Sequence, residues 1–113
     1  TRNEMTVKKI YANDKIIDVT GSGYGKKGDF LYKNKKIDAE EILLLLKAGS
    51  LNNNASLTDG NVIGDPTEGA LIVSAEKAGL SKEDLEKKNP RINEIPFTSE
   101  RKLMTTIHNI NRE

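Results

Sequence analysis

The sequence predicts an α+β domain in which helices pack against an antiparallel β-sheet. Residues 5–11 and 15–20 are rich in Val, Ile, Thr and Tyr and flank a short Ala-Asn-Asp turn, which is the pattern of a β-hairpin. Helix start signals follow in the middle of the chain, and two more strand-like segments come near its end. Because strands and helices are segregated rather than alternating, a doubly wound parallel sheet of the Rossmann type is disfavoured.

Composition limits the function classes. A chain of 113 residues is expected to form one domain that buries about two thirds of its unfolded surface. Eighteen basic and seventeen acidic residues leave a net charge of +1, so we expect neither nucleic acid nor a membrane surface as a direct partner. The chain has no cysteine and one histidine, which excludes thiolate and clustered-histidine metal sites. The aliphatic run 42–46 is far shorter than the ~20 residues that span a bilayer.

The segment after the first hairpin is rich in glycine and lysine. Gly23, Gly25 and Gly28 match the spacing G-x-G-x-x-G of dinucleotide-binding loops, but a strand-like segment at residues 30–33 follows them instead of a helix. We therefore interpret these glycines as a turn between strands. We interpret the polar, lysine-rich residues 33–36 as a solvated turn, since acidic residues elsewhere balance their charge.

The first helix is expected to start at Asp38, with Glu41 completing a capping box ahead of the aliphatic residues 42–46. Gly49 is expected to end it. This stretch is apolar on most sides, so we expect the helix to be well buried. Residues 52–61 are rich in Asn, Asp and Gly and are typical of a loop with a brief extended piece.

Two more helices and two strands complete the prediction. The second helix follows Asp65, with Pro66 at its first position and Glu68 placed to complete a capping box, and it ends at Gly79. A short charged helix over residues 81–87 is capped by Ser81. Two strands are predicted over residues 91–97 and 103–110, with a polar bend at residues 98–101 between them. His108, in the second strand, is expected to be a surface residue.

Three side chains in these elements suit a nucleotide. A carboxylate in the first turn of a helix, as at Glu68, can accept a hydrogen bond from an exocyclic amine such as that of adenine. The ring of Phe97 can stack on a purine, a contact worth ~1–3 kcal/mol per base, with the ammonium of Lys102 close by. The structural alternatives are an ordinary capping box, a core phenylalanine and a surface lysine.

Two motifs in this order resemble the nucleotide-binding domain of type II P-type cation-transporting ATPases, including bacterial calcium pumps. They are residues 64–71 (Gly-Asp-Pro-Thr-Glu-Gly-Ala-Leu) and 96–104 (Pro-Phe-Thr-Ser-Glu-Arg-Lys-Leu-Met). Residues 1–7 resemble the stretch after the phosphorylation loop Asp-Lys-Thr-Gly-Thr-Leu-Thr, with Thr1 as its last residue. Residues 19–24 and 53–55 resemble segments between the motifs, so the resemblance runs nearly end to end.

The resemblance implies that the chain binds the adenine end of ATP. In that family the matching glutamate approaches adenine, the phenylalanine stacks on it and the lysine lines the pocket, with other motif residues nearby. The nucleotide-binding residues implied here are Glu68, Phe97, Lys102, Thr67, Ser99, Arg101 and Met104. The γ-phosphate of ATP would reach an aspartate in a neighbouring phosphorylation domain, and Mg²⁺ would be held mainly by that domain and the phosphates.

The same resemblance implies a fragment. The phosphorylated aspartate precedes Thr1 in the family pattern, and the Lys-Gly-Ala motif should follow Glu113. We therefore expect a single nucleotide-binding domain over residues 1–113, without the C-terminal part of that domain. It would be a cytosolic piece of an integral plasma-membrane protein and partner of its phosphorylation and actuator domains. Alone it would not be catalytic, would bind ATP weakly and could self-associate through an unpaired edge strand. The main alternative is a noncatalytic interaction or regulatory domain of the same fold.

Overall fold

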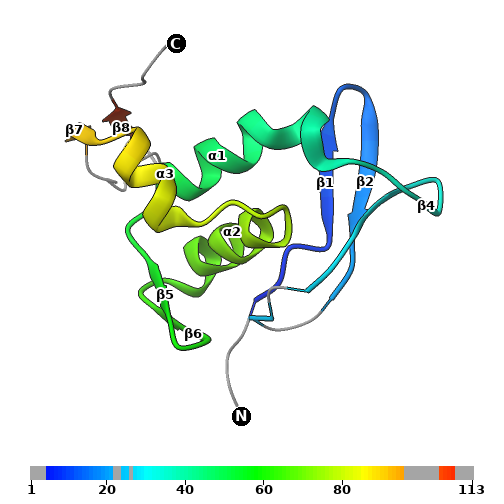
Figure 1. Cartoon of the computed structure of the whole chain (residues 1–113), viewed down its shortest axis with the longest axis horizontal. Helices are drawn as coiled ribbons and strands as arrows, with labels where there is room; N and C mark the ends of the chain where they lie inside the picture. Colours follow the sequence, from blue (N-terminus) through cyan, green and yellow to red (C-terminus); the bar gives the residue numbers. More distant parts are fainter. Residues whose placement is uncertain (1–4, 22–23, 26, 96–104, 109–113) are drawn as a thin grey trace.

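The computed structural model describes residues 5–21, 24–25, 27–95 and 105–108, which form helices and three antiparallel β-sheets (Figure 1). The elements in chain order are β1 (Lys9–Ala12), β2 (Lys15–Val19), β3 (Phe30–Tyr32), β4 (Lys35–Lys36), the 3-10 helix η1 (Ala39–Ile42), α1 (Leu43–Leu51), β5 (Ser56–Thr58), β6 (Asn61–Ile63), α2 (Pro66–Lys77), α3 (Lys82–Lys88), β7 (Arg91–Ile95) and β8 (Thr105–His108). The predicted α+β class with antiparallel pairing is confirmed.

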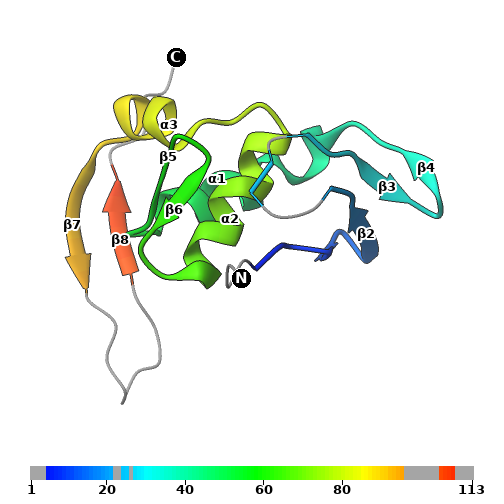
Figure 2. The same cartoon turned by 90° about the horizontal axis from the view of Figure 1, so that it is seen from below.

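The molecule has a sheet at each end and two helices between them. α1 and α2 pack together in the middle, the sheet β1-β2-β3-β4 lies at one end, and the β7–β8 hairpin lies at the other (Figures 1 and 2). The core joins α1 and α2 to the buried face of the first sheet. Its buried members are Ile10, Ile17, Val19, Phe30, Ile42, Leu46 and Ala75.

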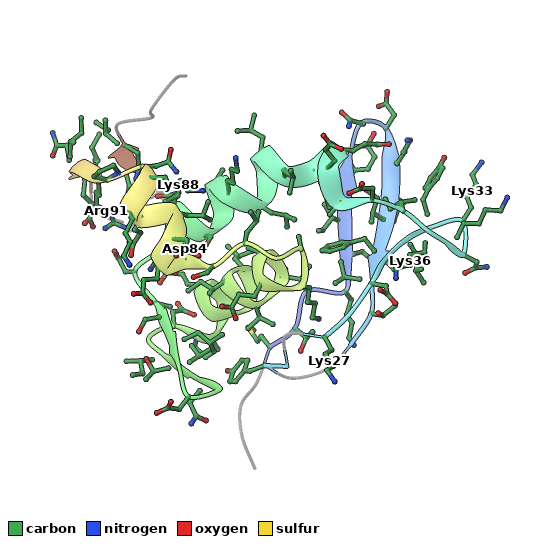
Figure 3. The ribbon with its side chains drawn as sticks, in the orientation of Figure 1. Lys27, Lys33, Lys36, Asp84, Lys88 and Arg91 are labelled. Carbon is green, nitrogen blue, oxygen red and sulfur yellow. The ribbon has the colours of Figure 1, made fainter. Side chains whose placement is uncertain are left out.

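Three hairpins share one kind of turn. Both central residues have positive φ at Asn13-Asp14, at Lys33-Asn34 and at Asp59-Gly60, as a two-residue type I′ turn requires. The first hairpin is confirmed, although β1 begins at Lys9 and not at residue 5. Of the predicted polar turn 33–36, residues 33–34 form the turn and Lys35–Lys36 form strand β4; Lys33 projects away from the helices (Figure 3). Residues 52–61 contain more structure than expected, because β5 pairs with β6.

The described glycines after β2, Gly21 and Gly28, lie against helix α2. Lys77 of α2 donates a hydrogen bond from Nζ to the carbonyl of Thr20 at 2.9 Å. A β-carbon on Gly28 would lie 2.4 Å from that carbonyl oxygen and 2.9 Å from Cδ of Lys77, so a side chain has no room there. Strand β3 follows, which confirms that the glycine spacing is not a dinucleotide-binding loop.

Helix α1 differs from its prediction in three respects. Asp38 accepts from the amide of Glu40, but the carboxylate of Glu41 pairs with Lys15 at 3.1 Å instead of completing a capping box. The helix continues through Gly49 to Leu51 instead of ending at the glycine. The expectation of a well-buried helix is wrong for part of the apolar run: Leu46 is buried but Leu44 is 80% exposed, since α1 packs against the rest of the chain on one side only.

The other two helices begin as predicted. Asp65 accepts from the amide of Thr67 at 2.8 Å, Pro66 occupies the first turn, and α2 ends just before Gly79, whose φ is +83°. Ser81 caps α3 through the amide of Asp84 at 3.4 Å. None of the helices in the described part of the chain is long and apolar enough to cross a membrane.

Candidate functional site

The candidate site is built around the first turn of α2. Glu68 lies there, half-buried, and its Oε1 accepts a hydrogen bond from the amide of Asn54 at 3.1 Å. The predicted capping box is therefore wrong for Glu68, because its carboxylate is bound to the loop after α1 while Asp65 alone caps the helix. Thr67, the neighbouring predicted residue, is exposed and donates from Oγ1 to Sδ of Met5 at 3.2 Å.

The loop after α1 is held by the buried side chain of Asn53. Its Nδ2 donates to the carbonyls of Gly49 at 3.0 Å and of Glu68 at 2.8 Å, and its Oδ1 accepts from the amide of Ala55 at 2.9 Å. The side-chain amide thus joins the end of α1 to the start of α2. With both polar atoms bonded, Asn53 sets the path of the chain that presents the Asn54 amide to Glu68.

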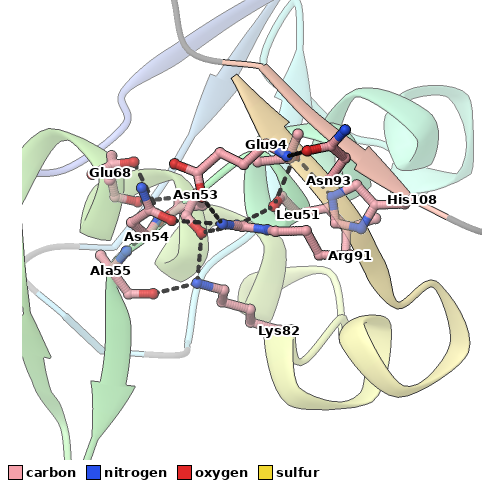
Figure 4. Close-up of polar contacts among 11 residues, drawn as sticks. Leu51, Asn53, Asn54, Ala55, Glu68, Lys82, Arg91, Asn93, Glu94 and His108 are labelled. Atoms are coloured by element: carbon pink, nitrogen blue, oxygen red, sulfur yellow. Dashed lines mark hydrogen bonds and ion pairs between the residues drawn. The ribbon is translucent and has the colours of Figure 1, made fainter. Parts of the chain in front are cut away.

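The guanidinium of Arg91 connects this loop to strand β7 (Figure 4). Nη1 donates to Oδ1 of Asn54 at 2.8 Å and to Glu94 at 3.0 Å. Nη2 donates to the carbonyl of Asn53 at 2.7 Å and to that of Leu51 at 3.2 Å. Arg91 therefore attaches the root of the β7–β8 hairpin to α1 and to the loop that contacts Glu68.

Lys82 at the start of α3 holds the same loop from another side. Its Nζ donates to the carbonyl of Asn53 at 3.0 Å and to that of Ala55. Burial lowers the pKa of Lys82, and the nearby charge of Arg91 lowers this pKa as well, while Glu86 and Glu68 partly oppose the shift. Two cations and the Glu68 carboxylate therefore meet around one loop.

Strand β8 is fastened by His108. Its Nδ1 lies 2.7 Å from the carbonyl of Asn89, and since a carbonyl only accepts, Nδ1 carries the hydrogen. Its Nε2 lies 2.8 Å from Oγ1 of Thr106. The expectation of a surface histidine is thus wrong, because the ring is half-buried and bonded at both nitrogens.

The structure places two of the seven predicted site residues, Thr67 and Glu68, next to each other on α2. The other five lie outside the described residues, in the segment that joins Ile95 of β7 to Thr105 of β8. They are Phe97, Ser99, Arg101, Lys102 and Met104. Within the described ranges, no group of three His, Asp or Glu side chains is placed to hold a metal ion.

Sequence reasoning missed Asn53, Lys82 and Arg91 as parts of this site. The resemblance at residues 53–55 was the one available signal, and it assigned no role to the asparagines. Lys82 binds main-chain carbonyls, as do two of the four hydrogen bonds of Arg91, and main-chain groups carry no sequence signature.

Comparison with known proteins decides the family. Residues 41–113, more than half of the chain, match the sequence model of the protein family described as P-type ATPase, cytoplasmic domain N. The chain belongs to this family. The membership confirms the resemblance found in residues 64–71 and 96–104, and it places Glu68 and the side chains around it within an N domain of cation ATPases.

This N domain is similar to transporters from distant organisms. It is 42% identical over 114 residues to a calcium-transporting ATPase of Bacillus subtilis and 40% identical over 121 residues to the cation-transporting ATPase pma1 of Synechocystis. It is 36% identical over 108 residues to calcium-transporting ATPase type 2C member 1 of Pongo abelii. The three alignments cover 95%, 96% and 92% of this chain but only 13%, 13% and 12% of the relatives, in that order, so the chain spans about an eighth of their length.

Proposed function

We propose that this N domain binds the adenine end of ATP. Glu68 accepts a hydrogen bond from the exocyclic amine, Phe97 stacks on the purine, and Lys102 lines the pocket. Thr67, Ser99, Arg101 and Met104 lie around the nucleotide. The observation that carries the proposal is the connection between Glu68 and the β7–β8 hairpin through Asn54 and Arg91, because the segment joining the two strands contains Phe97 and Lys102.

The chemistry of Glu68 suits this role. An ionised carboxylate offers about four acceptor positions, and the amide of Asn54 uses one of them. The side chain is half-buried, so its remaining acceptor capacity lies where water competes less strongly than at an open surface. A hydrogen bond from an adenine amine to this carboxylate would be charge-assisted.

In the larger protein, we propose, ATP bound here transfers its γ-phosphate to an aspartate of a neighbouring phosphorylation domain. The aspartyl-phosphate then drives cation transport, with Mg²⁺ held by the phosphates and that domain. Calcium is the cation we favour, because several relatives are named calcium-transporting ATPases. The domain would lie on the cytoplasmic side of the membrane and contact the phosphorylation and actuator domains.

Titration of the ¹⁵N-labelled chain with ATP and with AMP tests the proposal. We expect saturable shifts at Thr67 and Glu68 and within residues 96–104, of similar size for both ligands, since the base carries the contacts. Phe97→Leu keeps an apolar side chain but removes the π-face, and at ~1–3 kcal/mol per stacked base it should weaken binding about 5- to 150-fold.

A matched control separates a local effect from a change of charge. Glu68→Gln should weaken binding about tenfold, whereas Glu83→Gln, on the exposed side of α3 where it contacts Lys87 at 3.7 Å, should leave it unchanged. Scattered shifts that do not saturate at millimolar ATP would overturn the proposal and favour a noncatalytic interaction domain.

A further inference from the structure

We propose that Arg91 and Asn54 are positioning residues for the nucleotide: Arg91 fixes Asn54 and the root of β7, and Asn54 fixes the carboxylate of Glu68. This inference rests on the proposed function. It assigns a role to two residues that do not need to touch the ligand, and it predicts that one arginine controls the position of the Glu68 carboxylate.

The guanidinium of Arg91 donates hydrogen bonds from both of its terminal nitrogens. A guanidinium has four terminal N–H bonds, and here each terminal nitrogen meets two acceptors. The acceptors come from the end of α1, from the asparagine loop and from β7 itself. Because the guanidinium is planar and rigid, its four bonds fix the relative position of three segments, which the three tetrahedral donors of a lysine cannot reproduce.

Asn54 carries this constraint to Glu68. Its Oδ1 is held by Arg91 at 2.8 Å, while its amide nitrogen donates to Glu68 Oε1 at 3.1 Å. A carboxylate held through one oxygen samples fewer rotamers before a ligand arrives, so less conformational freedom is lost on binding. Release of Asn54 would therefore weaken the nucleotide contact even though the glutamate remains.

If Arg91 had only a structural role, a different result would be expected for the variants. If Arg91 only attaches β7 to α1, its loss lowers stability, and its effect on ATP affinity multiplies with that of Glu68→Gln. If Arg91 acts through Glu68, the two effects are not independent, because the glutamine variant has already lost the carboxylate that Arg91 positions. The double variant then binds about as weakly as Glu68→Gln alone.

The test compares Arg91→Gln, Arg91→Lys and Asn54→Ala in the full 113-residue chain, with Lys88→Gln as the matched control that removes one positive charge from the exposed end of α3. Chemical shifts of the Glu68 Cδ and the Asn54 amide are read without ligand, and dissociation constants are then measured for ATP and AMP. Thermal unfolding identifies variants that remain folded at the temperature used.

We expect both Arg91 variants and Asn54→Ala to move the two ligand-free resonances and to weaken ATP and AMP equally, by about tenfold. Lys88→Gln should change affinity by less than about twofold. Unchanged resonances in Arg91→Gln, unchanged affinity in the folded variants, or multiplying losses with Glu68→Gln would each overturn the inference. Failure of the wild-type chain to bind ATP would overturn the proposed function instead, and the ligand-free resonances distinguish the two results.

Discussion

The side-chain amide of Asn53 donates a hydrogen bond to the main-chain carbonyl of Glu68 across 2.8 Å, although the two residues are fifteen positions apart in the sequence. The asparagine is fully buried, and both of its polar atoms are used. The first turn of α2 is thereby attached to the chain that leaves α1. The position of Glu68 thus depends on a residue that no ligand needs to touch.

Asn53→Asp should destabilise the domain by about 3 kcal/mol. The substitution keeps the shape of the side chain but replaces the Nδ2 donor with an oxygen that faces the carbonyls of Gly49 and Glu68, which leaves buried acceptors without a donor. Urea unfolding measures the loss. Asn34→Asp in the exposed β3–β4 turn is the control, expected within about 0.5 kcal/mol of wild type, and an equal effect at both positions would contradict the argument.

The two glycines inside helices should respond to alanine in opposite directions. A β-carbon on Gly69 would lie 2.4 Å from Cγ1 of Val62, whose β-branched side chain moves little, so Gly69→Ala should cost about 1–2 kcal/mol. On Gly49 the nearest atom would be 3.7 Å away, and alanine should stabilise by up to about 1 kcal/mol. Thermal unfolding compares the two, and Val62→Ala should partly rescue Gly69→Ala.

Removal of the α2 cap should be measurable without loss of the fold. Asp65→Ala deletes the acceptor for the amide of Thr67 at 2.8 Å and should destabilise the domain by about 1 kcal/mol. Asp65→Asn keeps a capping oxygen and should cost clearly less. Chemical denaturation of the three proteins decides the point, and equal stability of the alanine variant and wild type would show that the cap contributes nothing.

The pKa of Lys82 is lowered below its ordinary value of 10.5 mainly by burial. Between that lowered pKa and 10.5 the unfolded chain binds more protons than the folded chain, so this group's contribution to the free energy of unfolding rises with pH in that window. At pH values below both pKa values the group is protonated in both states and its contribution is constant.

An NMR titration of the Lys82 Cε resonance checks this shift. Its midpoint should lie below that of the same resonance in urea-unfolded chain. Glu68→Gln removes a carboxylate that raises the pKa of Lys82, so the midpoint should fall further in that variant. A midpoint equal to that of the unfolded chain would contradict the burial argument.

Local chemistry predicted much of this fold. Pro66 and the caps at Asp65 and Ser81 act within one helical turn, so the sequence around them predicts where α2 and α3 begin. Burial of α1 was beyond such reasoning, because the apolar run containing Leu44 does not say on which side the neighbouring elements lie. Local rules also failed for Glu41, where the distant Lys15 displaces the capping box.

The candidate site was likewise predicted in part: its motifs could be read from the sequence, but its long-range contacts could not. Residues 64–71 and 96–104 could be recognised as motifs, and Glu68 was identified correctly as a residue on the first turn of a helix. Its real partner could not be predicted, because the Asn54 amide is a main-chain group. Arg91 reaches acceptors 37 to 40 positions earlier in the chain, and only the folded structure shows that they converge.

The contact between Lys77 and the glycine turn has a consequence for how such sequences are searched. The aliphatic stem of the lysine passes so close to Gly21 and Gly28 that a methyl group on either would collide with it or with a backbone oxygen. The glycine spacing that imitates a dinucleotide loop therefore includes one glycine, Gly28, at which a side chain of the same protein leaves no room for a β-carbon. Pattern searches based on glycine spacing would mistake this internal fit for cofactor recognition, and a lysine on a neighbouring helix, as at Lys77, is the feature that could tell the two apart.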